Sequence, residues 1–468
     1  MSNLLKIVLL CFLYFFIQET KGQTSPNTLE STLSFEEYLG YVKQHHPLIK
    51  QANLVLSTGE ANLLKARGGF DPKIEVDYDR KKFKEIEYYD QLNTTFKIPT
   101  WYGIEFKGNF EQNSGEFLNP SLDVPEDGLY SAGVSFALAK GFLINERMAT
   151  LKKARFFVKQ TQADQHLLVN NLIYDASLAY FKWIEAEKER NIYSTFLNNA
   201  TTRLDAVTRS VEEGDKAKID ITEARITTQN RRLALEAATL NAQKARLAVS
   251  NFLWLDDVPL EIEDGIIPTL PETSTLASVL ILTDITNTSI VIENHPKLAS
   301  LDAKIESLEV DQSLKKNKLL PKINLQYNFL SETPDQLDTF DTANYKAFVD
   351  VSFPIFFRKE RGDLKLARLK VKDATYDRTA ATLVITNKID AAKAEITSLE
   401  TQNNLIETII DDYETLVAAE ERKFFLGESS LFLINSREQK LIDAQLKENT
   451  LIIKELKAQA TLFNAAGL

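Results

Sequence analysis

Few residues of this chain have the types and spacing of a catalytic or metal-binding site. The only cysteine is Cys11, and the four histidines are His45, His46, His166 and His295. His46 and His295 each precede a proline, where they suit the cap of a helix better than a metal ligand. The sequence has no His-Glu-x-x-His pair, no glycine-rich phosphate loop and no nucleophile elbow. We therefore expect neither an enzyme nor a bound metal or cofactor.

The charge of the chain excludes another class of function. Its 468 residues include 55 Lys and Arg against 66 Asp and Glu, which gives a net charge of −11. A protein that binds nucleic acid needs basic patches for the phosphates, and the sequence has none. Because 44% of the residues are hydrophobic, the chain is also too apolar to be disordered. We expect a folded protein without a nucleic-acid partner.

The N-terminus has the pattern of a secretory signal peptide. Lys6 precedes an apolar run from Ile7 to Ile17, and the small and polar residues up to Gly22 suit a cleavage point. The run is too short to span a bilayer as a helix. We predict a signal peptide over 1–22. Since Cys11 lies inside it, we expect a mature chain with no cysteine and no lipid anchor.

Two halves of the chain repeat one plan. Matching segments lie 249 residues apart early in each half and 213 residues apart later. They are His46-Pro47 with His295-Pro296, Pro72-Lys73-Ile74 with Pro321-Lys322-Ile323, Gly214 with Gly427, and Asn251 with Asn464. The two offsets place a 36-residue insertion in the first half, between Tyr78 and Thr150. We predict a first repeat over 23–255, a linker or equatorial packing layer over 256–289, and a second repeat over 290–468.

The distribution of glycine and proline predicts long helices. Between residues 142 and 258 the only such residue is Gly214, and between 363 and 466 it is Gly427. Strands do not run that far without a turn, so we predict helical hairpins over 142–255 and 363–466. At 1.5 Å per residue, the longest helices would span about 100 Å.

Apolar spacing predicts that the first long helix has neighbours on two sides. It carries two adjacent seams, Leu168, Leu172, Ala176, Ala179, Trp183 and Ala186 in one, and Val169, Ile173, Tyr180 and Ile184 in the other. One seam suits a two-helix coiled coil, and two adjacent seams suit a ring of helices. A shorter helix expected at about 47–67 would stack end to end on the return helix of the hairpin.

Alternating apolar and polar residues predict strands at about 73–140 and 321–356. Ile74, Val76 and Tyr78 alternate with charged residues, and the insertion adds two more alternating runs. Runs of about ten residues with one apolar face are typical of transmembrane β-strands. In lipid such strands must form a closed barrel, and four to six per chain are fewer than the roughly eight of the smallest barrels. Either the strands are not membrane strands, or several chains share one barrel.

The duplicated helix–strand–strand–helix plan, the His-Pro openings and the turn at Gly214 resemble the TolC-type outer-membrane efflux proteins over the whole mature chain. In that family an Asp follows the turn glycine by six residues and precedes Val or Ile, as Asp220 and Ile221 do here. The resemblance implies a mainly α fold with a shared β-barrel part. It implies a homotrimer with a twelve-stranded barrel in outer-membrane lipid and a helical tunnel in the periplasm. The implied partners are a periplasmic adaptor (membrane fusion) protein and an inner-membrane pump of RND or ABC type.

The resemblance also implies that the tips of the hairpins contact the adaptor or form the aperture. The candidates are Gly214, Asp215, Asp220, Gly427 and Glu428. The second tip departs from the family, because Leu433 stands where the Asp would be. A simpler interpretation is that the glycines end helices and the acids favour the positive ends of the helix dipoles.

Aromatic residues flank the predicted strand ends, where they suit a membrane interface. They are Trp101, Tyr102, Phe142, Phe356 and Phe357. Packing between strands and helices is an equally good interpretation. The 36-residue insertion gives two alternatives, six strands per chain in a wider barrel or a hairpin added at the outer face. Because an unchanged ring of helices would fit a wider barrel poorly, we expect the hairpin.

Three functions fit these features. We expect first a passive exit duct for small toxic compounds or drugs, driven by the pump. Protein secretion in one step would use the same channel with other partners. A secreted structural coiled-coil protein with ordinary strands is an alternative of a different class.

Overall fold

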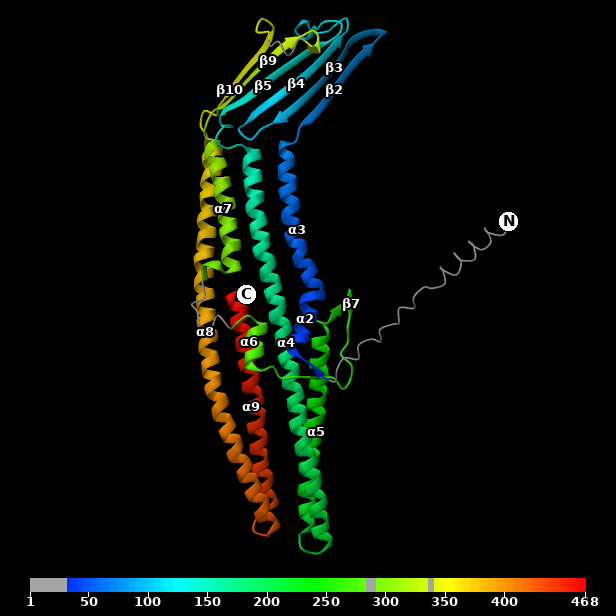
Figure 1. Cartoon of the computed structure of the whole chain (residues 1–468), viewed down its shortest axis with the longest axis vertical. Helices are drawn as coiled ribbons and strands as arrows, with labels where there is room; N and C mark the ends of the chain where they lie inside the picture. Colours follow the sequence, from blue (N-terminus) through cyan, green and yellow to red (C-terminus); the bar gives the residue numbers. More distant parts are fainter. Residues whose placement is uncertain (1–31, 283–291, 336–340) are drawn as a thin grey trace, which may run out of the picture.

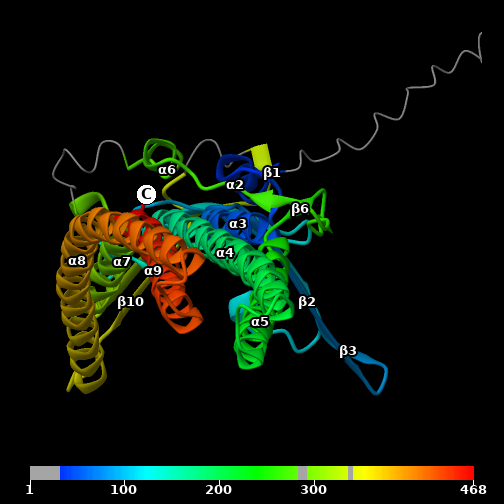
Figure 2. The same cartoon turned by 90° about the horizontal axis from the view of Figure 1, so that it is seen from below.

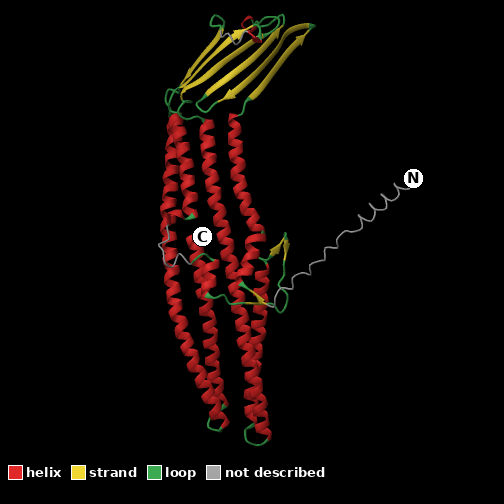
Figure 3. Cartoon of the chain, in the orientation of Figure 1, coloured by secondary structure: helices red, strands yellow, loops and turns green. Residues whose placement is uncertain are grey.

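The structure, a computed structural model of the whole chain, describes residues 32–282, 292–335 and 341–468. The long strands gather at one end of an elongated molecule, and helices form the rest (Figures 1 and 3). The predicted signal peptide at 1–22, with Cys11, lies outside the described residues. Within the described ranges, no helix is apolar over enough of its length to cross a membrane.

Each repeat runs from a helix through strands to a helical hairpin. The first repeat contains α2 (Phe35–His45), α3 (Pro47–Arg67), η1 (Gly68–Phe70), β2 (Lys73–Phe83), β3 (Ile86–Pro99), β4 (Ile104–Ser114), η2 (Pro120–Leu122), β5 (Leu129–Ala139), α4 (Glu146–Glu212) and α5 (Lys218–Ser250). The second contains η3 (Ile292–Asn294), α7 (Pro296–Asn317), β9 (Lys322–Ser331), β10 (Tyr345–Ser352), α8 (Arg358–Phe425) and α9 (Leu431–Ala466). Helix α2 was not predicted.

The helices form one curved layer. Helices α4 and α8 run its full height, α3 stands above α5, and α7 stands above α9 (Figure 1). Seen from below, α8 lies at one side of the curve and α5 at the other (Figure 2). Helix α4 contacts α3 and α5 as well as α7 and α9, so the predicted neighbours on two sides are confirmed. Most of its seam residues are buried, although Leu168 is 45% exposed.

The long strands form one antiparallel sheet in the order β10-β9-β5-β4-β3-β2. The two repeats meet where β5 pairs with β9, with Gly133 opposite Asn328. The expectation of an added hairpin at the outer face is wrong. Instead, the insertion adds two strands to the sheet. Strand β3 pairs along its length with β2, β4 pairs with β5, and β3 and β4 pair with each other.

A small layer packs on the helices at mid-height (Figure 1). It contains β1 (Thr32–Leu33), β6 (Trp254–Leu255), β7 (Val258–Pro259), β8 (Ile267–Pro268) and α6 (Thr273–Val279). The largest core lies beneath it, where Tyr38, Tyr180 and Trp183 are fully buried. The Tyr180 hydroxyl donates to the carbonyl of Leu33 at 2.6 Å. The same hydroxyl lies 3.0 Å from the carbonyl oxygen of Thr269, and β8 pairs with β1, so residues between the repeats tie α4 to the first residues of the described chain.

Candidate functional site

The six-stranded sheet has one apolar and one polar face. Paired positions across the strands carry the same character, because the registers align residues of one face. The apolar face includes Ile74, Val76, Tyr78, Leu92, Phe96, Ile98, Phe106, Phe110, Val134, Phe136, Leu325, Tyr327, Phe329, Val349 and Val351. The polar face includes Glu75, Asp77, Lys97, Lys107, Asn109, Gln326, Asn328 and Lys346. Such a sheet suits lipid on one face and water on the other.

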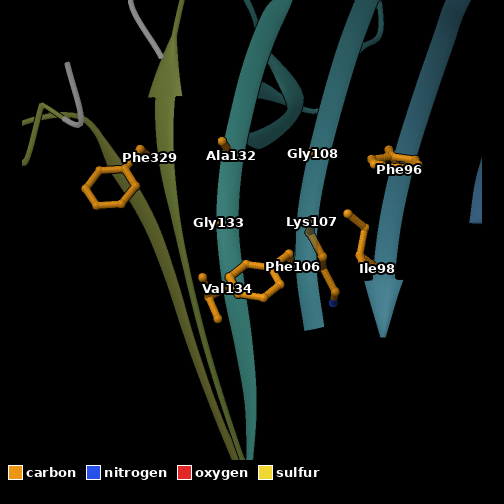
Figure 4. Close-up of a pocket in the computed structure, with 9 residues that line it drawn as sticks. All are labelled: Phe96, Ile98, Phe106, Lys107, Gly108, Ala132, Gly133, Val134 and Phe329. Carbon is orange, nitrogen blue, oxygen red and sulfur yellow. The ribbon is translucent and has the colours of Figure 1, made fainter. Parts of the chain in front are cut away.

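The middle of the apolar face is hollowed by small residues. Gly108 and Ala132 face each other there, and Phe96, Phe106 and Phe329 surround them (Figure 4). The hollow has a volume of about 370 Å³. Its side chains on this face are hydrocarbon, so it presents no hydrogen-bonding group that lipid would leave unsatisfied.

The polar face carries hydrogen bonds between side chains of different strands. Lys107 Nζ donates to Gln326 Oε1 at 3.2 Å, across β5. Thr95 Oγ1 donates to Asn109 Oδ1 at 2.8 Å. Gly133 lies between Lys107 and Asn328, where a Cβ would lie 2.1 Å from Asn328 Oδ1 and 2.3 Å from the Tyr327 carbonyl oxygen. The sheet therefore has no room for a side chain at this junction of the repeats.

The predicted interface aromatics fall into two groups. Trp101 stacks on Phe70, with ring centroids 5.6 Å apart, and packs against the start of α4. Tyr102, Phe142 and Phe356 are exposed at the helical ends of the strands, and Phe357 is half-buried. Trp101 thus packs between strand and helix, while the exposed rings have the placement that a membrane interface requires.

Two histidines join the stacked helices. His46 and His295 cap α3 and α7, and each accepts a hydrogen bond from the N–H two residues later, at 3.1 and 3.0 Å. His46 also bonds to the backbone of Asn251 at the end of α5, and His295 bonds to Ala465 near the end of α9. Burial lowers the pKa of both rings. The predicted stacking of the helix at 47–67 on the return helix is confirmed, and the same device recurs in the second repeat.

The first tip turns at Gly214, whose φ is 88°. The chain can reverse there because glycine tolerates the left-handed region. Asp215 is exposed, and Asp220 lies in the first turn of α5, where the helix dipole favours a carboxylate. Ile221 packs against a buried cluster that includes Leu431 of the second hairpin.

The second tip turns at Gly427, with φ of 79°. Glu428 beside it is exposed. This tip presents more large apolar side chains than the first, where Ile219 is 69% exposed, and Phe425 here is 83% exposed. The others are Leu426, Phe432 and Leu433. Sequence reasoning missed this patch, although its signal is visible as apolar residues on both sides of a glycine turn.

The two tips contact each other. Lys216 Nζ lies 3.7 Å from the ring centroid of Phe424, which joins the first turn to the end of α8. Val207, Ala224 and Leu431 are buried together just above, with Ile221 packed against them. The hairpins are therefore held together at their ends as well as along their lengths.

A buried cluster of charges joins all four helices of the hairpins. Arg203 of α4 donates to both carboxylate oxygens of Glu438 of α9, at 3.1 and 3.2 Å. Arg203 also donates to Glu421 of α8 at 3.0 Å, and Arg231 of α5 lies 3.8 Å from Glu438. Glu438 is only 1% exposed. Burial lowers the pKa of Arg231, and the charge of Glu438 opposes that shift.

Sequence reasoning missed this cluster. Its signal is a charge on an apolar stripe: Arg203 lies between Ala200 and Val207, and Glu438 lies between Ile434 and Leu441. Charges at such positions are buried in the packed hairpins, where they need partners. Elsewhere in the described ranges, no group of three or more His, Cys, Asp and Glu side chains is arranged to hold a metal ion.

Residues 288–468, which comprise the second repeat, match the outer membrane efflux protein family. No curated protein matches the chain in sequence. The family match bears out the resemblance seen in the sequence for the second repeat. The matched family is one of outer membrane efflux proteins and not of enzymes.

Solved outer-membrane channels match the fold of nearly the whole chain. The CmeC channel of Campylobacter jejuni matches with a TM-score of 0.64 at 14% identity, over 92% of this chain and 85% of that one. VceC of Vibrio cholerae gives 0.65 at 12% identity, over 92% and 95%. The open state of MtrE of Neisseria gonorrhoeae gives 0.65 at 13% identity, over 92% and 88%. The predicted fold class, long helical hairpins with a β part in two repeats, is confirmed.

Proposed function

We propose that this chain, whose second repeat belongs to the outer membrane efflux protein family and whose fold is that of solved outer-membrane channels, is one subunit of a homotrimeric exit duct. The duct lies in the outer membrane, with its helices in the periplasm. It receives cargo from an inner-membrane pump through a periplasmic adaptor. The observation that carries this proposal is a sheet with one apolar and one polar face, attached to helices long enough to cross a periplasm.

The sheet supports a shared barrel. One face suits hydrocarbon, but the two outer strands leave unpaired backbone groups that lipid cannot satisfy. Copies of the chain can satisfy them by pairing edge to edge. The apolar face then points outward to lipid and the polar face lines a wet channel.

The helices support a conduit. Helix α4 has 67 residues and α8 has 68, so each spans about 100 Å at 1.5 Å per residue. The sequence has no phosphate-binding loop that would supply energy from a nucleotide. The duct is passive, and transport is driven by a pump of RND or ABC type.

The tips are the proposed contact with the adaptor. The first tip offers Gly214, Asp215 and Asp220, and the second offers Gly427 and Glu428 beside an exposed apolar patch. A protein partner can use both features, since it can cover apolar side chains and pair with carboxylates at the rim.

The proposed cargo is small toxic compounds or drugs. Exit of a secreted protein in one step would use the same duct with another pump. The two cargoes are distinguished in a strain that lacks the gene. Loss of resistance to toxic compounds supports the first, and loss of a protein from the medium with unchanged resistance supports the second.

The experiment that tests the duct is complementation of that strain. The unaltered chain should restore export, while Asp220→Arg should reduce it without loss of trimer, because the charge at the adaptor contact is reversed. Glu407→Arg, at an exposed position of α8 well above the tip, serves as the control and should restore export fully. Full export with Asp220→Arg would contradict the docking role, and a chain absent from outer-membrane fractions would contradict the duct.

A further inference from the structure

We infer that three copies of this chain close an eighteen-stranded barrel, in which β2 of one copy pairs with β10 of the next. The inference rests on the proposed homotrimer, and it specifies the interface and the width of the pore. Each copy supplies six strands in one sheet, where the resemblance to the family implied four. The partner at both edges is therefore a second copy of this chain.

The directions of the outer strands permit this pairing. All neighbours in the sheet are antiparallel. In a sheet with an even number of strands the two outer strands run in opposite directions. Strand β2 leads away from the helices and β10 leads back to them (Figure 1). When copies meet edge to edge, β2 and β10 are antiparallel, as in every membrane barrel of this kind.

The outer strands β2 and β10 carry exposed apolar side chains. Ile74, Val76 and Tyr78 on β2 are 71%, 60% and 58% exposed, and Val349 and Val351 on β10 are 63% and 56% exposed. They continue the apolar face to both edges. Pairing there extends one apolar surface around the barrel and satisfies the backbone groups of both edges.

The stagger of the sheet sets the tilt of the strands. The pairs that begin at Lys73, the first residue of β2, lead across the sheet to Lys346 of β10, six residues before the last residue, Ser352. Both Lys73 and Ser352 lie at the helical end of the sheet. A shift of six residues over five strand spacings corresponds to a tilt of about 40°. Membrane barrels have tilts of about 35–45°.

At this tilt the sheet and the helices of one chain have the same width. A strand tilted by about 40° occupies about 6.3 Å of circumference, so six strands occupy about 38 Å. Four helices side by side occupy about 32–40 Å. The unchanged helical ring therefore fits eighteen strands, contrary to the expectation from the sequence. Twelve strands at this tilt would give a barrel about 24 Å across, and eighteen give about 36 Å.

The faces restrict the register of the new pairing. The apolar face holds even-numbered residues of β2 and odd-numbered residues of β10, and pairing must keep each face intact. Continuing the stagger by one more strand places Lys73 opposite Ser352 or Pro354 of the next copy. Val76 then lies opposite Val349 or Val351.

Cysteine cross-linking in outer membranes tests this interface. The full chain is expressed with Val76→Cys and either Val349→Cys or Val351→Cys, and the membranes are oxidised with copper phenanthroline. The only natural cysteine is Cys11, in the predicted signal peptide. We expect covalent dimers and trimers on denaturing gels from one of the two pairs. As a control, Val134→Cys with Val351→Cys should give none, because β9 separates these strands.

A third pair tests the four-strand alternative. If β2 and β3 lay outside the barrel, β4 would be the outer strand, and Phe106→Cys with Val351→Cys would cross-link copies. That result, or the absence of cross-links from both Val76 pairs, would overturn the inference. It would leave the duct itself in place if the same membranes still complement export, so the two proposals fail separately.

Discussion

The two repeats have matching helices and unequal strands. Helices α4 and α8 have 67 and 68 residues, α3 and α7 have 21 and 22, and α5 and α9 have 33 and 36. The first repeat has four long strands and the second has two. Helix length is constrained because each helix must end level with its neighbours in the layer. The number of strands is free as long as it stays even, since an added hairpin returns the chain to the helical end of the sheet.

The charges of the hairpins also differ between the repeats. Arg203 and Glu438 lie eleven residues from the tip glycine of their own repeat, and the corresponding residues of the other repeat are Leu416 and Arg225. Arg231 corresponds to Ala444. The buried cluster is therefore a contact between the repeats that has no copy at the corresponding positions. Variants that remove it test how strongly the two repeats hold each other, apart from the packing inside each hairpin.

The largest effect is expected from Glu438→Ala. This change leaves Arg203 and Arg231 buried without their shared carboxylate, which costs about 3–5 kcal/mol for a buried pair that loses one partner. The measurement is urea unfolding of the purified trimer in detergent, followed by far-UV circular dichroism. Glu407→Ala, at an exposed position of α8, should change stability by less than about 0.5 kcal/mol.

A combined variant sharpens this prediction. Arg203→Leu, Arg231→Ala and Glu438→Leu together remove the three most buried charges of the cluster and give two positions the residues that the other repeat has. Because buried ion clusters are often replaceable by apolar residues, we expect most of the stability to return. A triple variant as unstable as Glu438→Ala would show that the loss does not come from unpaired charge.

A smaller effect is expected where the two repeats meet within the sheet. Gly133→Ala introduces a Cβ against Asn328 and the Tyr327 carbonyl of the other repeat, and forcing a methyl group into a filled site costs about 1–3 kcal/mol. The control is Gly108→Ala on the apolar face, where nothing lies within 4 Å of the new Cβ. The readout is the fraction of protein that runs as a folded trimer on unheated gels. Equal behaviour of the two variants would mean that β5 and β9 separate easily.

The sequence predicted the helices and strands well because their signals are local. A glycine or proline gap of more than sixty residues leaves no alternative to a helix, and the alternation in β3 and β4 is visible without a neighbour. The sequence did not predict that β3 and β4 join the main sheet. Strand pairing depends on backbone groups of strands that are distant in sequence. The width of a barrel depends on the tilt of its strands, which the sequence does not reveal, so six strands per chain were expected to be too wide for the ring of helices.

The candidate sites were predicted only in part. The turns at Gly214 and Gly427 could be predicted because no other glycine or proline lies near them. Arg203 and Glu438 bind each other although they are 235 residues apart in the chain. No local pattern pairs them. Trp101 was indistinguishable from Tyr102 in sequence, because whether an aromatic ring packs on a helix or faces the membrane depends on where the helix begins.

A feature that the repeats share should respond to pH in both. His46 and His295 accept cap hydrogen bonds in their neutral forms, and burial lowers their pKa below that of the unfolded chain. The unfolded state therefore binds more protons, so stability is fully present above about pH 6.5 and falls as the pH drops below it. In His295→Asn the cap is kept without a titrating ring, so the part of the acid-side loss that comes from this ring should disappear. An unchanged pH profile for His295→Asn would contradict the assignment.

The smallest effect is expected where the tips touch. The lysine of this contact is present in the first repeat only. Lys216 lies over Phe424, whereas Ser429 stands at the position of Lys216 in the second repeat. A double-mutant cycle with Lys216→Met and Phe424→Leu should give a coupling of about 0.5–1 kcal/mol, the range for a cation over an aromatic ring near the surface. The control cycle pairs Lys218→Met with Phe424→Leu. Because the contact crosses between the hairpins, a coupling of zero would mean that it does not hold the tips together.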